Sequence, residues 1–168
     1  MQPQQAQQQA ERKQEGLDPK KEYKVPFEQT EIPALSADDA RSIKAGLAPI
    51  RTVVNLSPTR GRQTIEQVTK LLEHKDGDVR TDVAVTLERI GERLLKDETS
   101  AKNPEERDKL RSARYHILSG LAKQAGAEKD PQVLERLQGV AKKLATADEI
   151  KALRNAQPEV AERLFGKE

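Results

Sequence analysis

The sequence predicts an all-α fold, either a short stack of antiparallel helical hairpins or an irregular helical bundle, preceded by an extended N-terminal arm. Three observations lead to this prediction. From Ser36 onward, apolar residues recur at spacings of three and four, which is the period of an amphipathic helix. Helix-capping residues, often followed by proline, stand before most of these segments. Alternating runs of β-branched residues long enough for a strand are missing from the sequence.

The composition limits how the core can be built. Hydrophobic residues make up 35% of the 168 residues, and aromatic residues only 2%. Burial must therefore come from leucine, isoleucine, valine and alanine, which suit thin packing of helices better than large pockets lined by rings. The 30 lysines and arginines nearly balance the 28 aspartates and glutamates, and the two signs are interspersed. Such a pattern is typical of a solvated surface and not of a nucleic-acid footprint.

Residues 1–35 are expected to form an arm that is extended or disordered when alone, with the helical domain covering 36–168. The arm opens with a glutamine-rich tract, and two prolines in "VPFEQTEIPALS" bar a continuous helix. Residues 23–35 nevertheless carry apolar side chains, which predicts that they dock into a groove, on the chain's own helices or on a partner. The predicted anchors are Tyr23, Val25, Phe27, Ile32 and Leu35.

The first two helices are expected before residue 75. Ser36 is positioned to cap "ADDARSIKAGLA", and Pro49 should interrupt or kink that helix before a short continuation, "IRTVVNL". The next segment, "SPTRGRQTIEQVTKLLEH", has Ser57 as its cap and Pro58 at its first helical position. Its apolar residues fall on one face, and the loop "KDGD" ends it.

Five further helices are expected in the remainder of the chain. The first runs from about residue 78 to 96 with a single apolar stripe, and the polar segment "KDETSAK" is read as the loop that follows it. Asn103 and Pro104 then open a helix that Gly126 closes, and Asp130 opens "DPQVLERLQGVAKKLA". Finally, Thr146 and Glu149 predict a capping box for "ADEIKALRN", and Gln157 is a weak cap for a short last helix.

The stretch "DGDVRTDVAVTLERIG", residues 76–91, is similar to the second helix of a HEAT repeat, whose pattern is close to Asp-Pro-x-Val-Arg. Gly77 stands in place of the proline, while Val79 and Arg80 match. The resemblance, over residues 57–146, implies stacked antiparallel hairpins in which the valine fills the groove between helices and the arginine reaches acidic turn residues of a neighbouring repeat. "DPQVLERLQGVAKKLA" matches in part, with Val133 54 positions after Val79, whereas such repeats recur at about 40–47.

Catalytic or metal-binding motifs are not evident in the sequence. The chain has no cysteine, which excludes disulfides, thiolate catalysis and cysteine-containing zinc sites. His74 and His116 lie far apart without further ligands at metal-binding spacing, and no phosphate-binding glycine loop or nucleophile elbow occurs. We therefore expect no enzyme activity, no cofactor, no metal and no small-molecule substrate.

Two functions are compatible with these features of the sequence. The leading expectation is a non-enzymatic helical adaptor or structural subunit that mediates protein–protein interaction within a larger assembly. Its contacts would be the arm anchors together with Arg80, Arg60 and Arg62. The alternative is a weak nucleic-acid-associated protein that binds the phosphate backbone through Arg51, Arg60, Arg62 and Lys70. The candidate anion-binding or partner-binding residues are Arg51, Arg60, Arg62, Lys70 and Arg80. Because no signal peptide or membrane-spanning run is apparent, a cytoplasmic location is expected.

Overall fold

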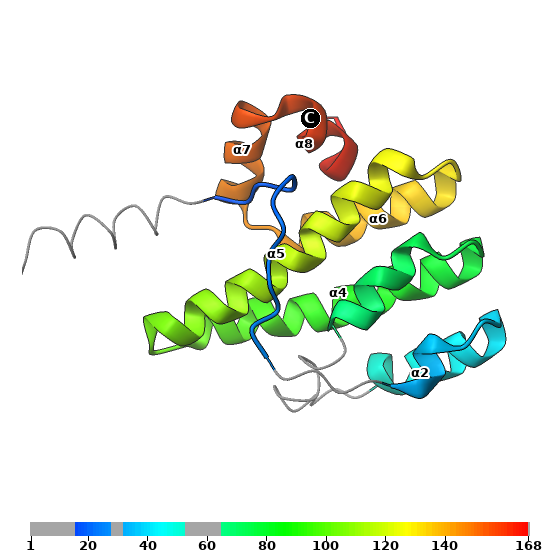
Figure 1. The fold of residues 1–168 in the computed structure, drawn as a ribbon. Coiled ribbons are helices and arrows are strands. Elements are labelled where there is room, and N and C mark those ends of the chain that lie inside the picture. Colours follow the sequence, from blue (N-terminus) through cyan, green and yellow to red (C-terminus); the bar gives the residue numbers. More distant parts are fainter. Residues whose placement is uncertain (1–15, 28–31, 53–64, 168) are drawn as a thin grey trace, which may run out of the picture.

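The computed structural model describes residues 16–27, 32–52 and 65–167, and all regular secondary structure in these ranges is helical (Figure 1). This confirms the all-α prediction. Residues 65–70 are also helical and lead directly into η2. The elements are η1 (Pro33–Ser36), α2 (Ala40–Thr52), η2 (Leu71–Glu73), α4 (Gly77–Ser100), α5 (Pro104–Ala127), α6 (Pro131–Leu144), α7 (Ala147–Ala156) and α8 (Pro158–Phe165).

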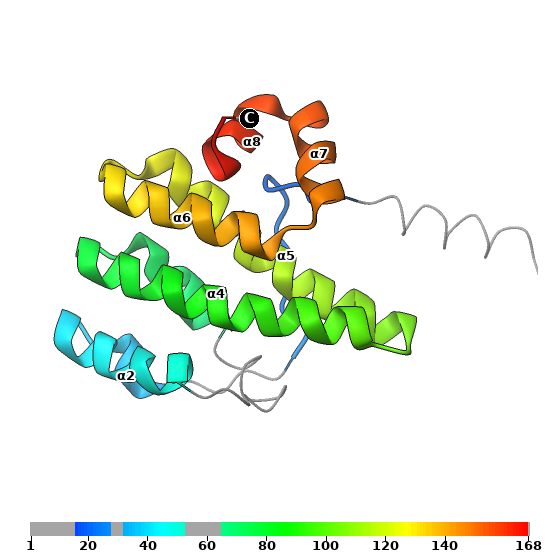
Figure 2. The ribbon, with the colours of Figure 1, turned by 180° about the vertical axis from the view of Figure 1, so that it is seen from behind.

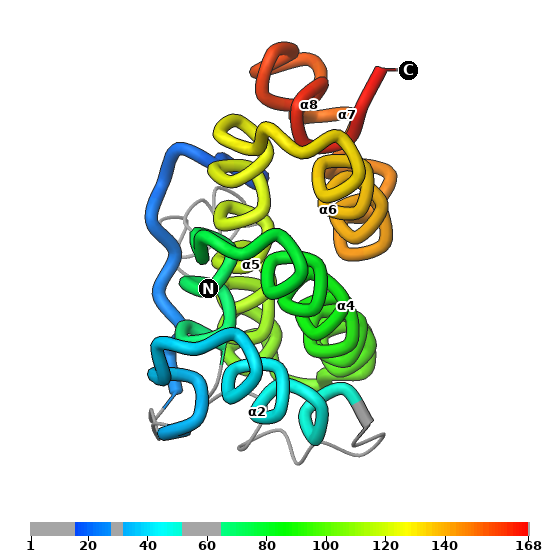
Figure 3. The backbone as a smooth tube through the Cα atoms, turned by 90° about the vertical axis from the view of Figure 1, so that its right-hand side faces the viewer, coloured from blue at the N-terminus to red at the C-terminus, as the bar shows by residue number. Residues whose placement is uncertain are grey.

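The helices form a short stack of antiparallel hairpins. Helices α2, α4 and α6 lie side by side in one layer (Figure 2), and residues 65–73 pack with α5 in a second layer. Gly77 lies close to Asp130 and Gly91 lies close to Leu144, so α4 and α6 run in the same direction. Helix α5, which connects α4 to α6 in the sequence, runs back in the second layer. Helices α7 and α8 close one end of the stack. The arm runs along the face of α5 that is turned away from α4 and α6 (Figure 3).

Local capping explains where most helices begin. Asp76 and Asp130 each accept hydrogen bonds from two backbone N–H groups of the following turn, and Asn103 accepts one. Thr146 and Glu149 form the reciprocal capping box that the sequence predicts. Gln157, the weak cap, makes no side-chain capping bond.

The start of α2 differs from the prediction. Ser36 ends the short η1 helix that Pro33 opens, and α2 begins only at Ala40. Its cap is Asp39, whose carboxylate accepts hydrogen bonds from the backbone N–H and the hydroxyl of Ser42. Pro49 does not interrupt the helix, which continues to Thr52. The predicted continuation through residue 56 and the cap at Ser57 lie in residues 53–64, outside the described ranges.

The predicted loop "KDETSAK" is wrong, because α4 remains helical as far as Ser100. Arg93 and Asp97 form an ion pair one turn apart, and the carboxylate of Glu98 is buried against α5. A polar sequence therefore continues the helix, because its acidic residue has partners on the next helix. Two helices of 24 residues each, and not an enlarged loop, account for the long interval between Val79 and Val133.

Close helix packing depends on two glycines. A Cβ atom added at Gly91 of α4 would lie 2.4 Å from Leu144 Cδ2 of α6, and one added at Gly120 of α5 would lie 2.4 Å from Thr69 Cγ2. Leu144 is fully buried, so its branched end has no space to move into. These contacts set the distance between neighbouring helices in a core that is mostly aliphatic.

We predict that Gly91→Ala destabilises the protein by about 1–3 kcal/mol through overpacking against Leu144. Gly139→Ala is the matched control, because Gly139 is also inside a helix but has nothing within 4 Å of its added Cβ. The control should stabilise the protein by about 0.5–1 kcal/mol through helix propensity. Urea denaturation followed by circular dichroism measures both effects. Equal stability of the two variants would contradict the packing argument.

Candidate functional site

The candidate site arises from a difference in helix length. Helix α6 ends at Leu144, beside Gly91, whereas α4 continues to Ser100 and α5 begins only at Pro104. The α4–α5 hairpin therefore projects beyond α6 (Figure 1). The chain turns after α6 into α7, and a cleft of about 670 Å³ lies between α7 and the projecting hairpin. We call it the step cleft; its lining includes Glu98, Thr99, Arg107, Arg111, Arg114, Tyr115, Asp148, Glu149 and Ala152, with Gly16 of the arm at its edge.

Arg114 lies at the base of the step cleft with only 1% of its side chain exposed. Its guanidinium donates to both oxygens of Glu98 (2.9 and 3.2 Å) and to both oxygens of Glu149 (2.6 and 3.0 Å). A further bond of 2.9 Å reaches the carbonyl oxygen of Leu144. One arginine of α5 thus connects the end of α4, the end of α6 and the first turn of α7.

The two carboxylates have further partners. Glu149 accepts hydrogen bonds from the hydroxyl of Tyr115 and from the backbone N–H of Thr146. Glu98 also accepts a bond of 2.6 Å from Nε of Arg111. The buried ion network is therefore fully hydrogen-bonded, which is the condition under which buried charges are tolerated.

The network shifts the ionisation of its members. Burial alone would raise the pKa of Glu149, but the hydrogen bonds and charge of Arg114 lower it below its ordinary value of 4.5. Burial alone would lower the pKa of Arg114, yet Glu149 and Glu98 raise it. Burial and the adjacent Glu149 raise the pKa of Tyr115. Each group is held in a single protonation state at neutral pH.

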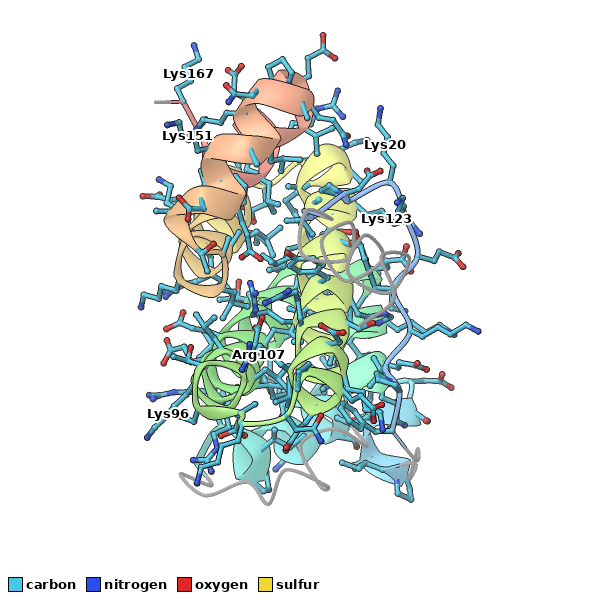
Figure 4. All side chains as sticks on the ribbon, turned by 90° about the vertical axis from the view of Figure 1, so that its left-hand side faces the viewer. Lys20, Lys96, Arg107, Lys123, Lys151 and Lys167 are labelled. Carbon is cyan, nitrogen blue, oxygen red and sulfur yellow. The ribbon has the colours of Figure 1, made fainter. Side chains whose placement is uncertain are left out.

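The rim of the step cleft is different, because its arginines have unused donors. Arg107 donates through Nη2 to the carbonyl of Ala101, and no other bond of its guanidinium occurs within the described residues. Among the described residues, Arg111 makes its hydrogen bond through Nε, toward Glu98. The two residues are four positions apart on α5 and so lie on the same helix face. Figure 4 shows Lys96 and Lys151 on the same side of the molecule as Arg107.

The predicted arm anchors pack against the chain's own helices. Val25 and Leu35 are buried, and Tyr23, Phe27 and Ile32 pack on the same core. The ring of Tyr23 meets Tyr115 edge to face at 5.2 Å, and the hydroxyl of Ser112 donates to the carbonyl of Lys24. This arrangement corresponds to docking on the chain's own helices, one of the two alternatives.

His116 adds to this docking. Its Nδ1 lies 2.7 Å from the carbonyl oxygen of Tyr23, and because a carbonyl can only accept, Nδ1 carries the proton. Sequence reasoning missed Leu17, which lies upstream of the predicted docking segment and is also buried. Asp18 beside it accepts a hydrogen bond from the side chain of Gln157, at the α7–α8 junction.

The predicted basic residues do not form one anion site among the described residues. Arg51 lies 3.4 Å from the carboxylate of Asp82 on α4. Arg80 forms a two-point ion pair with Glu128 and donates to the carbonyl of His74. Lys70 is exposed, and Arg60 and Arg62 lie outside the described residues. Glu128 belongs to the turn between α5 and α6, so Arg80 makes the kind of contact that the repeat resemblance implied.

The Arg114 network was not predicted from the sequence, although a signal for it exists. Arg114 follows Leu110 by four positions and precedes Ile117 by three, so it lies on the buried stripe of α5. Glu98 likewise follows Leu94 by four on α4. A charged residue on an apolar stripe requires a buried partner, and opposite charges on two adjacent helices supply one.

We predict that Glu149→Gln lowers the free energy of unfolding by about 3 kcal/mol at pH 7, because Arg114 loses a buried charge partner. The folded-state pKa of Glu149 is lowered, so its charge stabilises the fold above pH 4.5, and this contribution is lost as pH falls through the folded-state pKa. The difference between variant and wild type should therefore shrink in acid. Denaturation at several pH values measures this difference, with Glu135→Gln, a change at an exposed position of α6, as the control. A loss of stability in Glu149→Gln that does not depend on pH would contradict the assignment.

We also predict that the docked arm stabilises the helical domain. Removing residues 1–27 should lower the free energy of unfolding by about 3 kcal/mol relative to removing residues 1–15, because Leu17 and Val25 lose their burial. The two truncated proteins differ only in residues 16–27. Thermal and urea denaturation of both proteins gives the comparison, and equal stabilities would show that the arm contacts contribute nothing.

Within the described ranges, no three histidine, aspartate or glutamate side chains are placed to hold a metal ion together. None of the helices described there is both long and apolar enough to cross a membrane. No family model, curated protein or solved structure matches the chain.

Proposed function

We propose that the protein is a non-catalytic helical adaptor within a larger assembly, and that its step cleft binds a segment of a partner protein. The observation that carries the proposal is the cleft itself, which combines a rigid base with arginine donors that the described chain does not use. Preorganised pockets with a few convergent polar groups are the usual form of a recognition site.

The closed ends of the stack support this proposal. Helices α7 and α8 cover one end of the stack and bury Leu164 and Phe165. At the other end η1 packs against α2 and buries its own Leu35 there. Stacked helical units need such caps when no neighbour covers their apolar faces. Because the protein supplies its own caps, a partner is not needed to complete the core, and binding can be separate from folding.

The ionisation of the step cleft favours binding over catalysis. A general acid or base works best when its pKa lies near the operating pH. The pKa of Glu149 is lowered and that of Tyr115 is raised, so both move away from neutrality. Such groups are suited to holding a surface in shape.

A second groove of about 680 Å³ follows the outer side of α6 and supports a weaker case. Its lining is mostly solvent-exposed, and Lys143 already pairs with Glu88 of α4. Without a buried base, side chains there would have to become ordered on binding, which reduces affinity.

The proposal is tested by photo-crosslinking from single positions. A benzophenone amino acid at Ala152, an exposed residue of the cleft wall, should crosslink to a defined partner protein in the native cell. The same change at Ala45, exposed on α2 at the other end of the stack, is the matched control and should give no specific adduct. Equal adducts at both positions, or none at Ala152, would contradict the proposal.

The alternative function is separated by the nature of the adduct. Binding through the phosphate backbone should yield adducts that nuclease removes and binding that weakens steeply with salt. Under the adaptor proposal, the adduct at Ala152 survives nuclease, and mass spectrometry identifies a second protein in it.

A further inference from the structure

We propose that the step cleft recognises an acidic segment of its protein partner, with carboxylates bound by Arg107 and Arg111. This inference rests on the proposed function and specifies the chemistry of its ligand. Guanidinium groups bind carboxylates through paired N–H donors, and such charge-assisted bonds are stronger than bonds between neutral groups.

The unused donors of the two arginines determine what can be bound. Only one nitrogen of Arg107 and only one of Arg111 make a hydrogen bond in the described chain. The side chain of Arg111 is 31% exposed and lines the cleft, while its Nε is bonded to Glu98. One carboxylate for each arginine, on residues one helical turn or two extended residues apart, would satisfy these donors.

The charges around the cleft support an acidic ligand. The charges of Glu98 and Glu149 are balanced by those of Arg114 and Arg111, so these four groups are neutral together, and Arg111 contributes hydrogen-bond donors and no excess charge. Arg107, Lys96 and Lys151 remain on this side of the molecule (Figure 4). Asp148 is an exposed carboxylate of the lining, but it lies in the first turn of α7, where the helix end offsets its charge.

The shape of the site suits an extended peptide segment. A smaller pocket of about 300 Å³ lies beside the step cleft and shares Gly16, Arg111 and Tyr115 with it. Arg111 therefore lines both hollows, and a bound chain that continued past it would lie along the arm. Lys21 of the arm lines the smaller pocket and adds positive charge there, opposite Asp108.

The same surroundings disfavour a single-stranded nucleic acid. Such ligands depend on stacking of bases on exposed aromatic rings. Tyr115, a ring of the lining, is only 5% exposed, and Tyr23 beside it is in contact with it edge to face. We therefore assign the arginine pair to carboxylates of a protein and treat phosphate binding as an outcome of the test.

The test uses the full chain and three probes. A peptide of twelve residues that alternates serine with glutamate is titrated into protein labelled with ¹⁵N arginine, and the same peptide with glutamine is the neutral probe. Twelve-residue oligothymidylate is the phosphate probe. The Nε–H signals of Arg107 and Arg111 should shift with the acidic peptide, while that of Arg93, paired with Asp97, should not.

Two matched double variants assign the binding. Arg107→Gln with Arg111→Gln should weaken the affinity for the acidic peptide at least tenfold, measured by fluorescence anisotropy. Arg136→Gln with Lys142→Gln removes the same charge from two exposed positions of α6 and should change this affinity less than twofold. If the first pair fails to fold by circular dichroism, Arg107→Lys with Arg111→Lys keeps the charge but loses the paired donors, and should still weaken binding.

The inference is overturned if the glutamine peptide binds as well as the acidic one, if the arginine variants bind as the wild type does, or if the oligonucleotide binds more tightly than the peptide. These failures are distinguishable from failure of the adaptor function. Crosslinking of a partner protein at Ala152 without acidic-peptide binding would retain the adaptor and reject only the ligand chemistry.

Discussion

The ion network of Arg114 is the interaction on which the arrangement of the C-terminal half depends. A guanidinium that is 1% exposed would be strongly unfavourable in a helical core without compensation. Glu98 and Glu149 provide that compensation from α4 and α7, and the carbonyl of Leu144 adds the end of α6. Replacing these charges with apolar residues of similar size could give an equally stable core. The charged version differs because its hydrogen bonds are directional, which favours the relative placement of the helix ends that forms the base of the step cleft.

The same network explains two features that otherwise look unrelated. Helix α4 extends through a polar sequence because Glu98 is needed four residues beyond Leu94, on the buried side. Helix α7 begins at Ala147 because Glu149 serves both as the partner of Arg114 and as a member of the capping box with Thr146. The two carboxylates that satisfy the buried arginine stand on opposite sides of the step cleft, Glu98 on the projecting hairpin and Glu149 on α7.

Sequence reasoning succeeded where the signal is local and failed where it depends on tertiary partners. The caps at Asn103 and Asp130 were predictable because each bonds to backbone groups within its own first turn. The helical state of 96–100 was not, since the partners of Glu98 lie 13 and 16 positions away. The docking of the arm was predictable only in kind: its bonds join residues 88 and 93 positions apart, and no pattern in the arm specifies α5 as the receiving surface. For the site, the sequence indicated exposed basic residues near a helix start, whereas the structure places the step cleft at residues 95–115 and 146–152, beside Gly16 of the arm.

The structure separates the residues that hold the cleft from those proposed to act in it. Arg114, Glu98 and Glu149 have their bonding capacity directed inward, so changes to them affect stability first. Arg107 makes one bond to a backbone carbonyl at the hairpin turn, and its removal leaves no buried charge unpaired. Arg111 is intermediate, because Glu98 keeps Arg114 as a partner when Arg111 is changed. The buried network holds the cleft in shape, whereas the proposed binding uses the donors of Arg107 and Arg111, four residues apart on one helix. Changes at the rim can therefore alter which ligand is bound while the base stays fixed.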